Sequence, residues 1–359
     1  MPAPTPKILE ELDGEDRGAG YLHGQLLAHV GNHDRVIEAS QYWKIAPVIY
    51  RGPAGARLIR DSGGDQLEAG RPAVLDPEGY ERDRRHGRRA QDLAIGSRLA
   101  VTFAPAFAAD HRAPARLHRF MTTTADLLED RLRRSDIGGQ LVPTLRLTNH
   151  WLTDHRLNEL LAEWVADSAR SIAVVLANPY NPLETTDAIV GMLRLVATGR
   201  VVPLRGDHAS IAFLVAGARF ASAGTSGTVR HLYNGGPPKN RRPGPGHEVF
   251  HWQTHTWIKH YRLGVLHFPD WALECFCPVC EGRSIRRFQD PAREIEVIAH
   301  NIGLLRLLAW DTAASGNGLD EWLDRCDAAA DAATELQRVA GGLRLGAAAR
   351  AWADVRITA

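Results

Sequence analysis

Three of the four cysteines fall within six residues, at Cys275, Cys277 and Cys280, and His300 follows twenty positions after them. Three thiolates with one imidazole are the ligand set that a tetrahedral Zn2+ ion prefers. The alternative is a set of buried apolar cysteines beside a solvated histidine, which the tight spacing of the three sulfurs disfavours. Four protein ligands leave no open coordination position, so we expect a structural zinc site, with any catalytic chemistry located elsewhere.

The segments around these ligands fit that purpose. Pro278 and Gly282 predict a turn that folds the thiolates around one point. The spacing of apolar residues over 295–304 predicts an amphipathic helix that brings His300 back to them. The element before the cysteines is less clear, because three more histidines recur there at four-residue spacing.

These histidines are His247, His251 and His255. On a helix they would share one face and could bind a second metal ion. Because the residues between them favour a strand and no carboxylate joins the set, we expect no second metal site here.

A carboxylate also stands out near the start of the chain, at Asp61, directly after the strand-like run 56–60. In a barrel of alternating strands and helices, the carboxyl ends of the strands form the active face. Ser62, Gly63 and Gly64 would place backbone amides beside this acid, where a ligand can approach closely. The alternative is an ordinary polar turn, in which Asp, Ser and Gly are common.

Strand-like and helical segments alternate along the chain, which predicts parallel strands joined by right-handed crossovers. We therefore expect an α/β fold, a (β/α)8 TIM barrel, with a doubly wound sheet as the alternative. The predicted strands are 43–50, 56–60, 99–103, 141–145, 171–176, 201–204 and 218–222, and the predicted helices are 120–132, 155–169, 185–197, 208–216 and a pattern over 319–355.

Four regions follow from this pattern. Residues 1–55 complete the barrel, 56–233 form its main part, 234–310 hold a Pro- and Gly-rich basic loop with the zinc-binding subdomain, and 311–359 form C-terminal helices. No run of 18 apolar residues and no signal-peptide pattern occurs, and the cysteines are clustered rather than arranged as a disulfide framework. These features predict a cytoplasmic protein with no membrane segment.

The formal net charge is +1, so the protein has no global field that would attract nucleic acid. Any basic footprint must be local. The one concentrated basic stretch lies in the loop with Lys239, Arg241 and Arg242, and Arg230 is close to it in the sequence. Such side chains could contact phosphates, and the nearby aromatic residues could stack on an unpaired base. The alternative is a solvated loop.

The segment around Asp61 and the cysteine cluster together resemble a known family. Asp61-Ser62-Gly63-Gly64-x-Gln66 is similar to the DSGGFQ motif of the tRNA-guanine transglycosylases, and the cysteines with His300-Asn301 are similar to that family's zinc site. The resemblance covers about residues 55–310, with both motifs in the family's order. It implies a zinc-containing (β/α)8 barrel that exchanges guanine in tRNA, or in DNA for some paralogues, for a 7-deazaguanine-type base.

The resemblance also implies a mechanism with two carboxylates, one a nucleophile at the sugar and one a general acid and base. Asp61 matches the general acid/base, and Ser62, Gly63, Gly64 and Gln66 match substrate-binding positions. The nucleophile position corresponds to Ala221, whose methyl group cannot attack. Asp207, after the preceding strand, could supply a relocated carboxylate, or could simply cap the following helix.

Three hypotheses remain. The first is an active base-exchange transglycosylase with purine or 7-deazapurine substrates. The second is a catalytically inactive zinc-containing subunit that binds nucleic acid, which Ala221 favours. The third is a barrel reused for another reaction. The resemblance further implies a homodimer or a heteromer with a catalytic relative.

Overall fold

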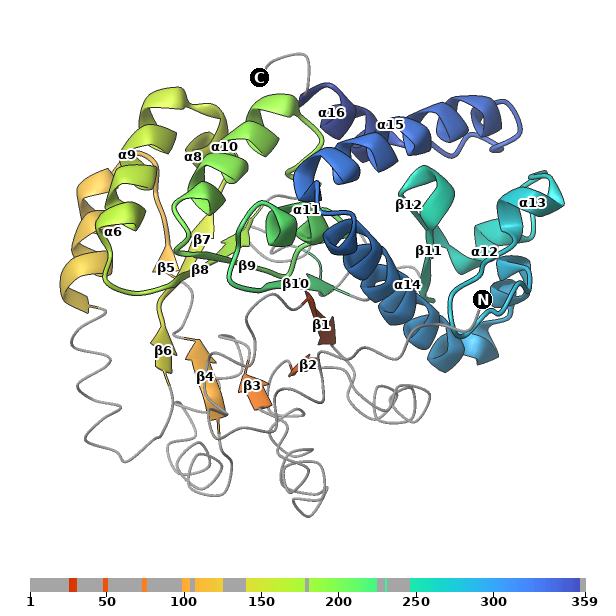
Figure 1. The fold of residues 1–359 in the computed structure, drawn as a ribbon, viewed down its shortest axis with the longest axis horizontal. Coiled ribbons are helices and arrows are strands. Elements are labelled where there is room, and N and C mark those ends of the chain that lie inside the picture. Colours follow the sequence, from red (N-terminus) through yellow and green to blue (C-terminus); the bar gives the residue numbers. More distant parts are fainter. Residues whose placement is uncertain are drawn as a thin grey trace.

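Parallel strands and helices make up the described residues before position 225. The computed structural model describes residues 26–30, 48–50, 73–75, 99–103, 107–124, 140–177, 181–224, 230 and 246–355. Within these residues the architecture is mixed α/β, with two parallel sheets and one antiparallel hairpin (Figure 1).

The larger sheet has six strands in the order β10-β1-β2-β3-β4-β6, and the smaller has four in the order β5-β7-β8-β9. Every neighbouring pair in both sheets is parallel. The strands are β1 (Leu26–Val30), β2 (Val48–Tyr50), β3 (Ala73–Leu75), β4 (Leu99–Phe103), β5 (Phe107–Ala108), β6 (Gln140–Val142), β7 (Thr144–Leu147), β8 (Ile172–Leu176), β9 (Val201–Leu204) and β10 (Ala221–Gly224).

The two sheets meet at two points. Pro143 alone separates β6 from β7 and, having no N–H, it interrupts the strand ladder there. At the other end, a bridge between Gly206 and Ala223 connects the segment after β9 to β10. No closed barrel is found among the described strands, so the parallel α/β arrangement is confirmed but the predicted TIM barrel is not.

Helices cover the smaller sheet on one side (Figure 1). Asp154 begins α9 by accepting a hydrogen bond from the Leu157 N–H, a common role for aspartate at a helix start. Gly191 lets α10 approach α8 closely, because a Cβ there would lie 2.1 Å from the Leu152 carbonyl oxygen. These helices are α6 (Pro114–Arg119), the π turn Phe120–Thr124, α8 (His150–Thr153), α9 (His155–Asp167) and α10 (Thr186–Ala197), whereas α11 (Ser210–Val215) contacts β10 and β1 of the larger sheet.

Several predicted elements lie where the sequence places them, including the strands at 99–103 and 201–204. The strand predicted at 218–222 instead occupies 221–224. The reason is the end of α11, where Gly217 adopts φ 108° and the Ala218 N–H donates to the Phe213 carbonyl. This turn delays the start of β10 by three residues.

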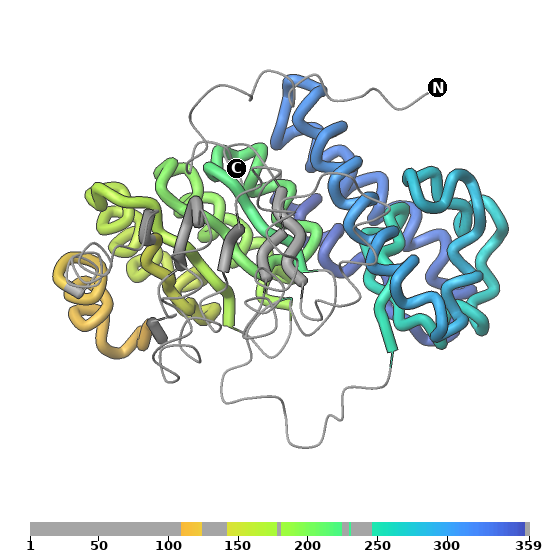
Figure 2. Tube along the Cα trace, turned by 90° about the horizontal axis from the view of Figure 1, so that it is seen from below, coloured from red at the N-terminus to blue at the C-terminus, as the bar shows by residue number. Residues whose placement is uncertain are grey.

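The remainder of the described chain gathers at one end of the molecule, drawn in teal and blue in Figure 2. Its core includes Trp322 and Trp352, which pack edge to face, and Phe213 from α11. The elements are β11 (Glu248–His251), the 3-10 turn Trp252–Thr254, β12 (Thr256–Lys259), α12 (His260–Leu263), α13 (Asp270–Leu273), the 3-10 turns Ile285–Gln289 and Pro291–Arg293, α14 (Glu294–Ala314), α15 (Gly318–Gln337) and α16 (Ala347–Ala353).

The division of the chain at residue 310 stays a prediction, and α14 runs across that position. The helical pattern predicted over 319–355 is two helices, because Gly341 and Gly342 both have positive φ in the connection between them. Within the part of the chain that the structure describes, no helix is long and apolar enough to cross a membrane.

Candidate metal centre

The three clustered cysteines and the predicted histidine come together in the structure. The Sγ atoms of Cys275, Cys277 and Cys280 lie 3.7, 3.4 and 3.2 Å from His300 Nδ1. All four ligand atoms lie within 4.8 Å of one another, and all four residues are buried. The cluster could therefore hold a metal ion.

A tight turn presents the three thiols. The Cys277 carbonyl accepts hydrogen bonds from the N–H groups of Cys280 and Glu281, at 3.0 and 2.9 Å. Glu281 and Gly282 then adopt φ values of 52° and 86°, which only glycine tolerates readily. The Gly282 N–H donates to the Cys275 carbonyl, so the turn predicted at Gly282 closes the chain on itself.

The fourth ligand comes from α14, a helix that is buried on every side around His300. The imidazole Nε2 lies 3.1 Å from the Phe250 carbonyl oxygen of β11. If Nε2 carries the proton and donates it to that carbonyl, Nδ1 keeps its lone pair for a metal ion. Next along the helix, Asn301 accepts from the Phe250 N–H and donates to the Glu248 carbonyl, which fixes α14 against the hairpin.

Charged side chains surround the thiol cluster. Arg287 Nη2 lies 3.3 Å from Cys280 Sγ and 2.8 Å from Glu296 Oε1. Burial opposes ionisation of Glu296, but hydrogen bonds from Arg293 and Arg287 lower its pKa overall. The guanidinium of Arg287 is thus held beside the sulfurs, where it favours their thiolate form.

The crowding of the thiols also favours loss of a proton. Hydrogen bonds from the thiols of Cys275 and Cys280 lower the pKa of Cys277 to about 3. The same contacts raise the pKa of Cys275, because that thiol acts as a donor to its neighbours. A metal ion would replace these shared protons by binding all three sulfurs as thiolates.

The geometry fits a tetrahedral ion. Typical Zn–S and Zn–N bond lengths at a tetrahedral angle place each sulfur about 3.6 Å from the ligating nitrogen. The observed separations of 3.2–3.7 Å bracket this value. Sulfur and imidazole ligands select soft or borderline metals over Mg2+ or Ca2+. The residues that are present therefore suit a metal of the zinc type.

The predicted carboxylate Asp207 lies just beyond the carboxyl end of β9. Its Oδ1 accepts a hydrogen bond from the Ala209 N–H at 2.8 Å, and its Oδ2 accepts from Asn181 Nδ2 at 2.9 Å. The side chain is buried. Both oxygens thus support the two loops that follow β8 and β9, and a role as nucleophile stays a prediction.

Ala221, the residue that the sequence resemblance would match to a nucleophile, lies in β10. Ala221 is fully buried there and pairs in register with Leu26 of β1. Ser222, the next residue, uses its hydroxyl and its carbonyl to bind the Arg205 and Gly206 N–H groups. These contacts pack β10 closely against the end of β9, and the buried Ala221 side chain carries no reactive group.

The sequence hypothesis missed Glu184 and Asn181 in the loop after β8. Burial raises the pKa of Glu184, and the nearby negative charge of Asp207 raises it further. The carboxyl ends of parallel strands meet at one edge of a sheet, so a search of every loop after a predicted strand would have found these residues.

Most of the other predicted site residues lie outside the described part of the chain: Asp61, Ser62, Gly63, Gly64, Gln66, Lys239, Arg241 and Arg242. Arg230 is described and is buried. Its guanidinium forms an ion pair with Glu248 and lies 3.8 Å from the centre of the Trp257 ring. Its charge is paired with this carboxylate, and the phosphate contact of Arg230 stays a prediction.

A buried group of rings joins the segment after β9 to the β11–β12 hairpin and to α15. His208 stacks on Phe250 and packs against His255 and Trp322, with ring centres 5.2, 5.3 and 6.1 Å away. Neither ring nitrogen of His208 has a hydrogen-bond partner. Burial lowers its pKa, although the charge of Asp207 opposes this shift. His208 is therefore a neutral ring held by packing alone.

The three histidines of the hairpin region do not form a second metal site in the described structure. His251 instead binds Thr254 Oγ1 and the Ala272 carbonyl, at 2.8 and 2.6 Å. His255 lies 3.8 Å from Cys326 Sγ, and His247 lies 3.0 Å from the Phe288 carbonyl.

Comparison with known proteins provides no relative: no family model matches this chain, and no curated protein matches it.

Proposed function

We propose that the Cys275, Cys277, Cys280 and His300 cluster binds one structural Zn2+ ion. The support is the donor set, its burial and the spacing of its ligand atoms. Three thiolates and Zn2+ carry one net negative charge, and Arg287 lies beside it as a counter-ion. All four cysteines are free of disulfides, which fits the expected cytoplasmic location.

We further propose that the parallel strands form a (β/α)8 barrel. If β6 and β7 count as one strand bent at Pro143, the two sheets join into a single parallel series from β1 to β9. The Gly206 N–H donates to the Ser222 carbonyl, and the Gly224 N–H donates to the Gly206 carbonyl. These bonds connect the end of β9 to β10, which pairs with β1.

The function that best unites these features is modification of a nucleic-acid base. In this proposal the chain resembles a tRNA-guanine transglycosylase and exchanges guanine for a 7-deazaguanine-type base, with Asp61 as general acid and base. The observation that carries the proposal is the zinc-type Cys3His cluster at the spacing of that family, on an α/β scaffold of parallel strands. Asp61 and its neighbours would contact the base at the strand ends.

A second candidate is supported by β10. Ala221 is buried and has no reactive group, and both oxygens of Asp207 already accept hydrogen bonds. On this reading the protein keeps the scaffold and the metal but acts as a non-catalytic subunit that binds nucleic acid. It would then work as a homodimer or beside a catalytic relative.

Labelled guanine separates the two candidates. We expect the purified protein to incorporate the label into tRNA or into duplex DNA, and we expect Asp61→Asn to lower the rate about 10²–10⁴-fold. Asp167→Asn, on the exposed end of α9, is the matched control and should keep the rate. Tight binding without any incorporation would favour the non-catalytic subunit, and absence of both would refute the proposed function.

A further inference from the structure

The guanidinium of Arg287 contacts the thiol cluster from outside, and several groups hold it in one position. Its Nη2 donates to Cys280 Sγ at 3.3 Å and to Glu296 Oε1 at 2.8 Å. Its Nε donates to the same carboxylate oxygen at 3.0 Å, and its Nη1 donates to the Ser284 carbonyl at 2.8 Å. The guanidinium carbon also lies over the Phe288 ring, 4.2 Å from its centre. All three nitrogens of this side chain are therefore engaged, and one of them is directed at a sulfur atom.

The helix that supplies the histidine ligand also supplies the carboxylate that holds Arg287. Glu296 and His300 are four residues apart on α14, so their side chains share one face of the helix. The His300 ring packs against Phe288, with ring centres 5.1 Å apart, and Phe288 is also the ring under the guanidinium. The side chain of Arg287 is only 16% exposed and that of Glu296 20%. One face of α14 thus fixes both a metal ligand and the cation beside the thiols.

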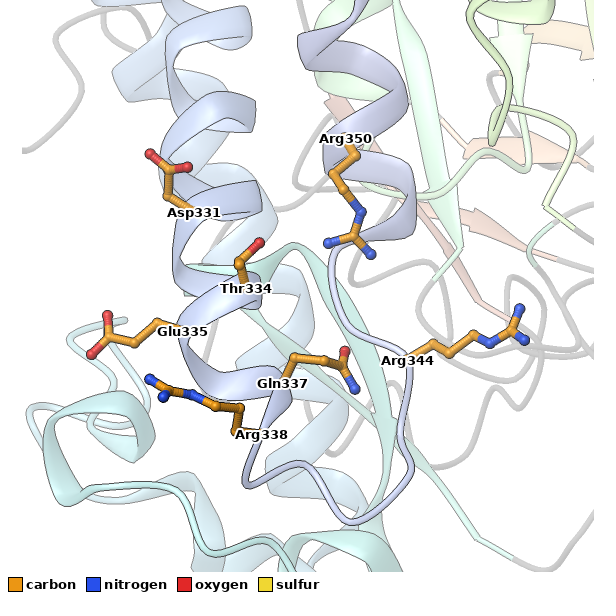
Figure 3. Close-up of a pocket in the computed structure, with 7 residues that line it drawn as sticks. All are labelled: Asp331, Thr334, Glu335, Gln337, Arg338, Arg344 and Arg350. Atoms are coloured by element: carbon orange, nitrogen blue, oxygen red, sulfur yellow. The ribbon is translucent and has the colours of Figure 1, made fainter.

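The arginines near the connection between α15 and α16 provide a contrast. Arg338 lies beside Glu335 on the outer flank of α15, and Arg344 points away from it (Figure 3). Arg350 Nη2 donates to the Leu345 carbonyl at 2.6 Å. These guanidinium groups do not converge on one point, so they indicate no site. Arg344 is exposed and lies on a segment that supplies no metal ligand, which makes it a suitable control for Arg287.

We propose that Arg287 is a positioning residue of the metal centre, which sets how tightly the centre holds zinc, and that Glu296 acts through Arg287. Three thiolates, a neutral imidazole and Zn2+ sum to one negative charge, and a guanidinium at 3.3 Å from one sulfur offsets it. Hydrogen bonds between two charged groups are stronger than neutral ones, and this pair is largely shielded from water. The inference rests on the proposed zinc site but not on base exchange.

Zinc affinity is the first test, measured on the purified full-length protein by competition with a chelator. We expect Arg287→Met to weaken zinc binding about 10–100-fold, the usual effect of losing a partner that orients a metal ligand. Arg287→Lys keeps the charge but loses the planar fork that reaches both Cys280 and Glu296, so its loss should be smaller. The control Arg344→Met should bind zinc as tightly as wild type.

Glu296→Gln tests whether the carboxylate acts through Arg287. Alone, this substitution should weaken zinc binding by less than Arg287→Met does, because the guanidinium keeps its charge but loses its anchor. In the Arg287→Met background it should add no further loss, since residues that act as one unit are not additive. Additive losses would show that Glu296 does not act through Arg287.

Cobalt substitution separates a hydrogen bond to sulfur from an ion pair that only braces the fold. A hydrogen bond stabilises the sulfur lone pair, so it raises the energy of the sulfur-to-cobalt charge-transfer absorption. We expect Arg287→Met loaded with Co2+ to absorb at longer wavelength than wild type. Arg344→Met should keep the wild-type spectrum, and Glu296→Gln should lie between the two.

The outcomes distinguish the role of Arg287 from the zinc site itself. If wild type binds zinc and Arg287→Met keeps the wild-type affinity, the role of Arg287 is wrong while the zinc site stands. Weaker binding with an unchanged cobalt spectrum would reduce Arg287 to a brace and would also refute the inference. If Arg287→Met does not fold, Arg287→Lys and Glu296→Gln decide by the same two measurements. A wild type that binds no zinc would refute the metal site and this inference together.

Discussion

The metal centre and the strand ends around β9 and β10 differ in whether their buried polar side chains have hydrogen-bond partners. At the metal centre the two buried polar side chains of α14 both have partners: His300 Nε2 lies 3.1 Å from the Phe250 carbonyl oxygen, and Asn301 accepts a hydrogen bond from the Phe250 N–H of β11. At the strand ends His208 is buried with two unpartnered nitrogens, and Asp207 is tied into its own loops. The hydrogen bonds at the metal centre hold its side chains in one arrangement. At the strand ends, burying the unpartnered His208 nitrogens costs free energy, which the surrounding packing must offset.

The two regions therefore differ in how directly their geometry indicates a function. At the metal centre, the arrangement of the four ligand atoms is enough to indicate metal binding. A region with an unpartnered buried histidine beside a carboxylate invites a functional interpretation, but its described groups do not supply a reactive constellation. Three measurements test whether the two regions differ in this way.

The largest effect is expected at the metal centre. Cys277→Ser should remove the bound zinc and destabilise the surrounding fold strongly, because structural zinc binding contributes about 10 kcal/mol or more of folding free energy. Metal analysis and thermal unfolding provide the two measurements. Cys326→Ala is the matched control, since Cys326 is the one cysteine outside the cluster and is also buried. Full zinc content in Cys277→Ser would refute the ligand assignment.

An intermediate effect is expected from acid. Burial lowers the pKa of His251 to about 4, whereas the same side chain titrates near 6.5 when unfolded. Between these values the unfolded chain binds a proton that the folded chain does not, so stability falls as the pH drops from 6.5 toward 4. The loss for this one group is about 3 kcal/mol over the full range.

Chemical denaturation at pH 7 and pH 5 tests this prediction, with zinc content followed in the same samples. His251→Phe should show a smaller difference between the two pH values than wild type. Because any zinc release affects both proteins, it cancels from the comparison. An identical pH dependence would show that His251 is not held neutral by the fold.

The smallest effect is expected at the strand ends. Replacing His208 by Phe removes two buried nitrogens without partners and keeps a ring among Phe250 and Trp322, so we expect a gain of about 1 kcal/mol at pH 7. The same substitution at His251 leaves the Ala272 carbonyl unpaired and should cost about 1–3 kcal/mol. Equal destabilisation by both substitutions would remove the contrast between the two regions.

The sequence predicted local features well. Strands at 99–103 and 201–204 and the turn at Gly282 follow from short-range patterns, and the structure has each of them. Errors arose where neighbouring elements set the boundary. The left-handed turn at Gly217 shifted β10, and Pro143 divided one predicted strand into two.

The metal ligands were predictable because three of them lie within six residues and their chemistry is unusual. The partners that orient them were not. The Phe250 carbonyl is fifty residues from His300, and nothing in either local pattern marks that contact. The commitment of Arg230 to Glu248 and Trp257 was hidden for the same reason.

Residue identity and spacing were thus enough to predict the composition of the metal centre, the alternation of strands and helices, and the absence of a carboxylate at Ala221. These depend on residue identity and on periodicity, which local physics controls. The folded arrangement, in contrast, settles which charges are neutralised and which histidine is buried without a hydrogen-bond partner. Such outcomes depend on distances between segments far apart in the chain, and those distances are set by packing.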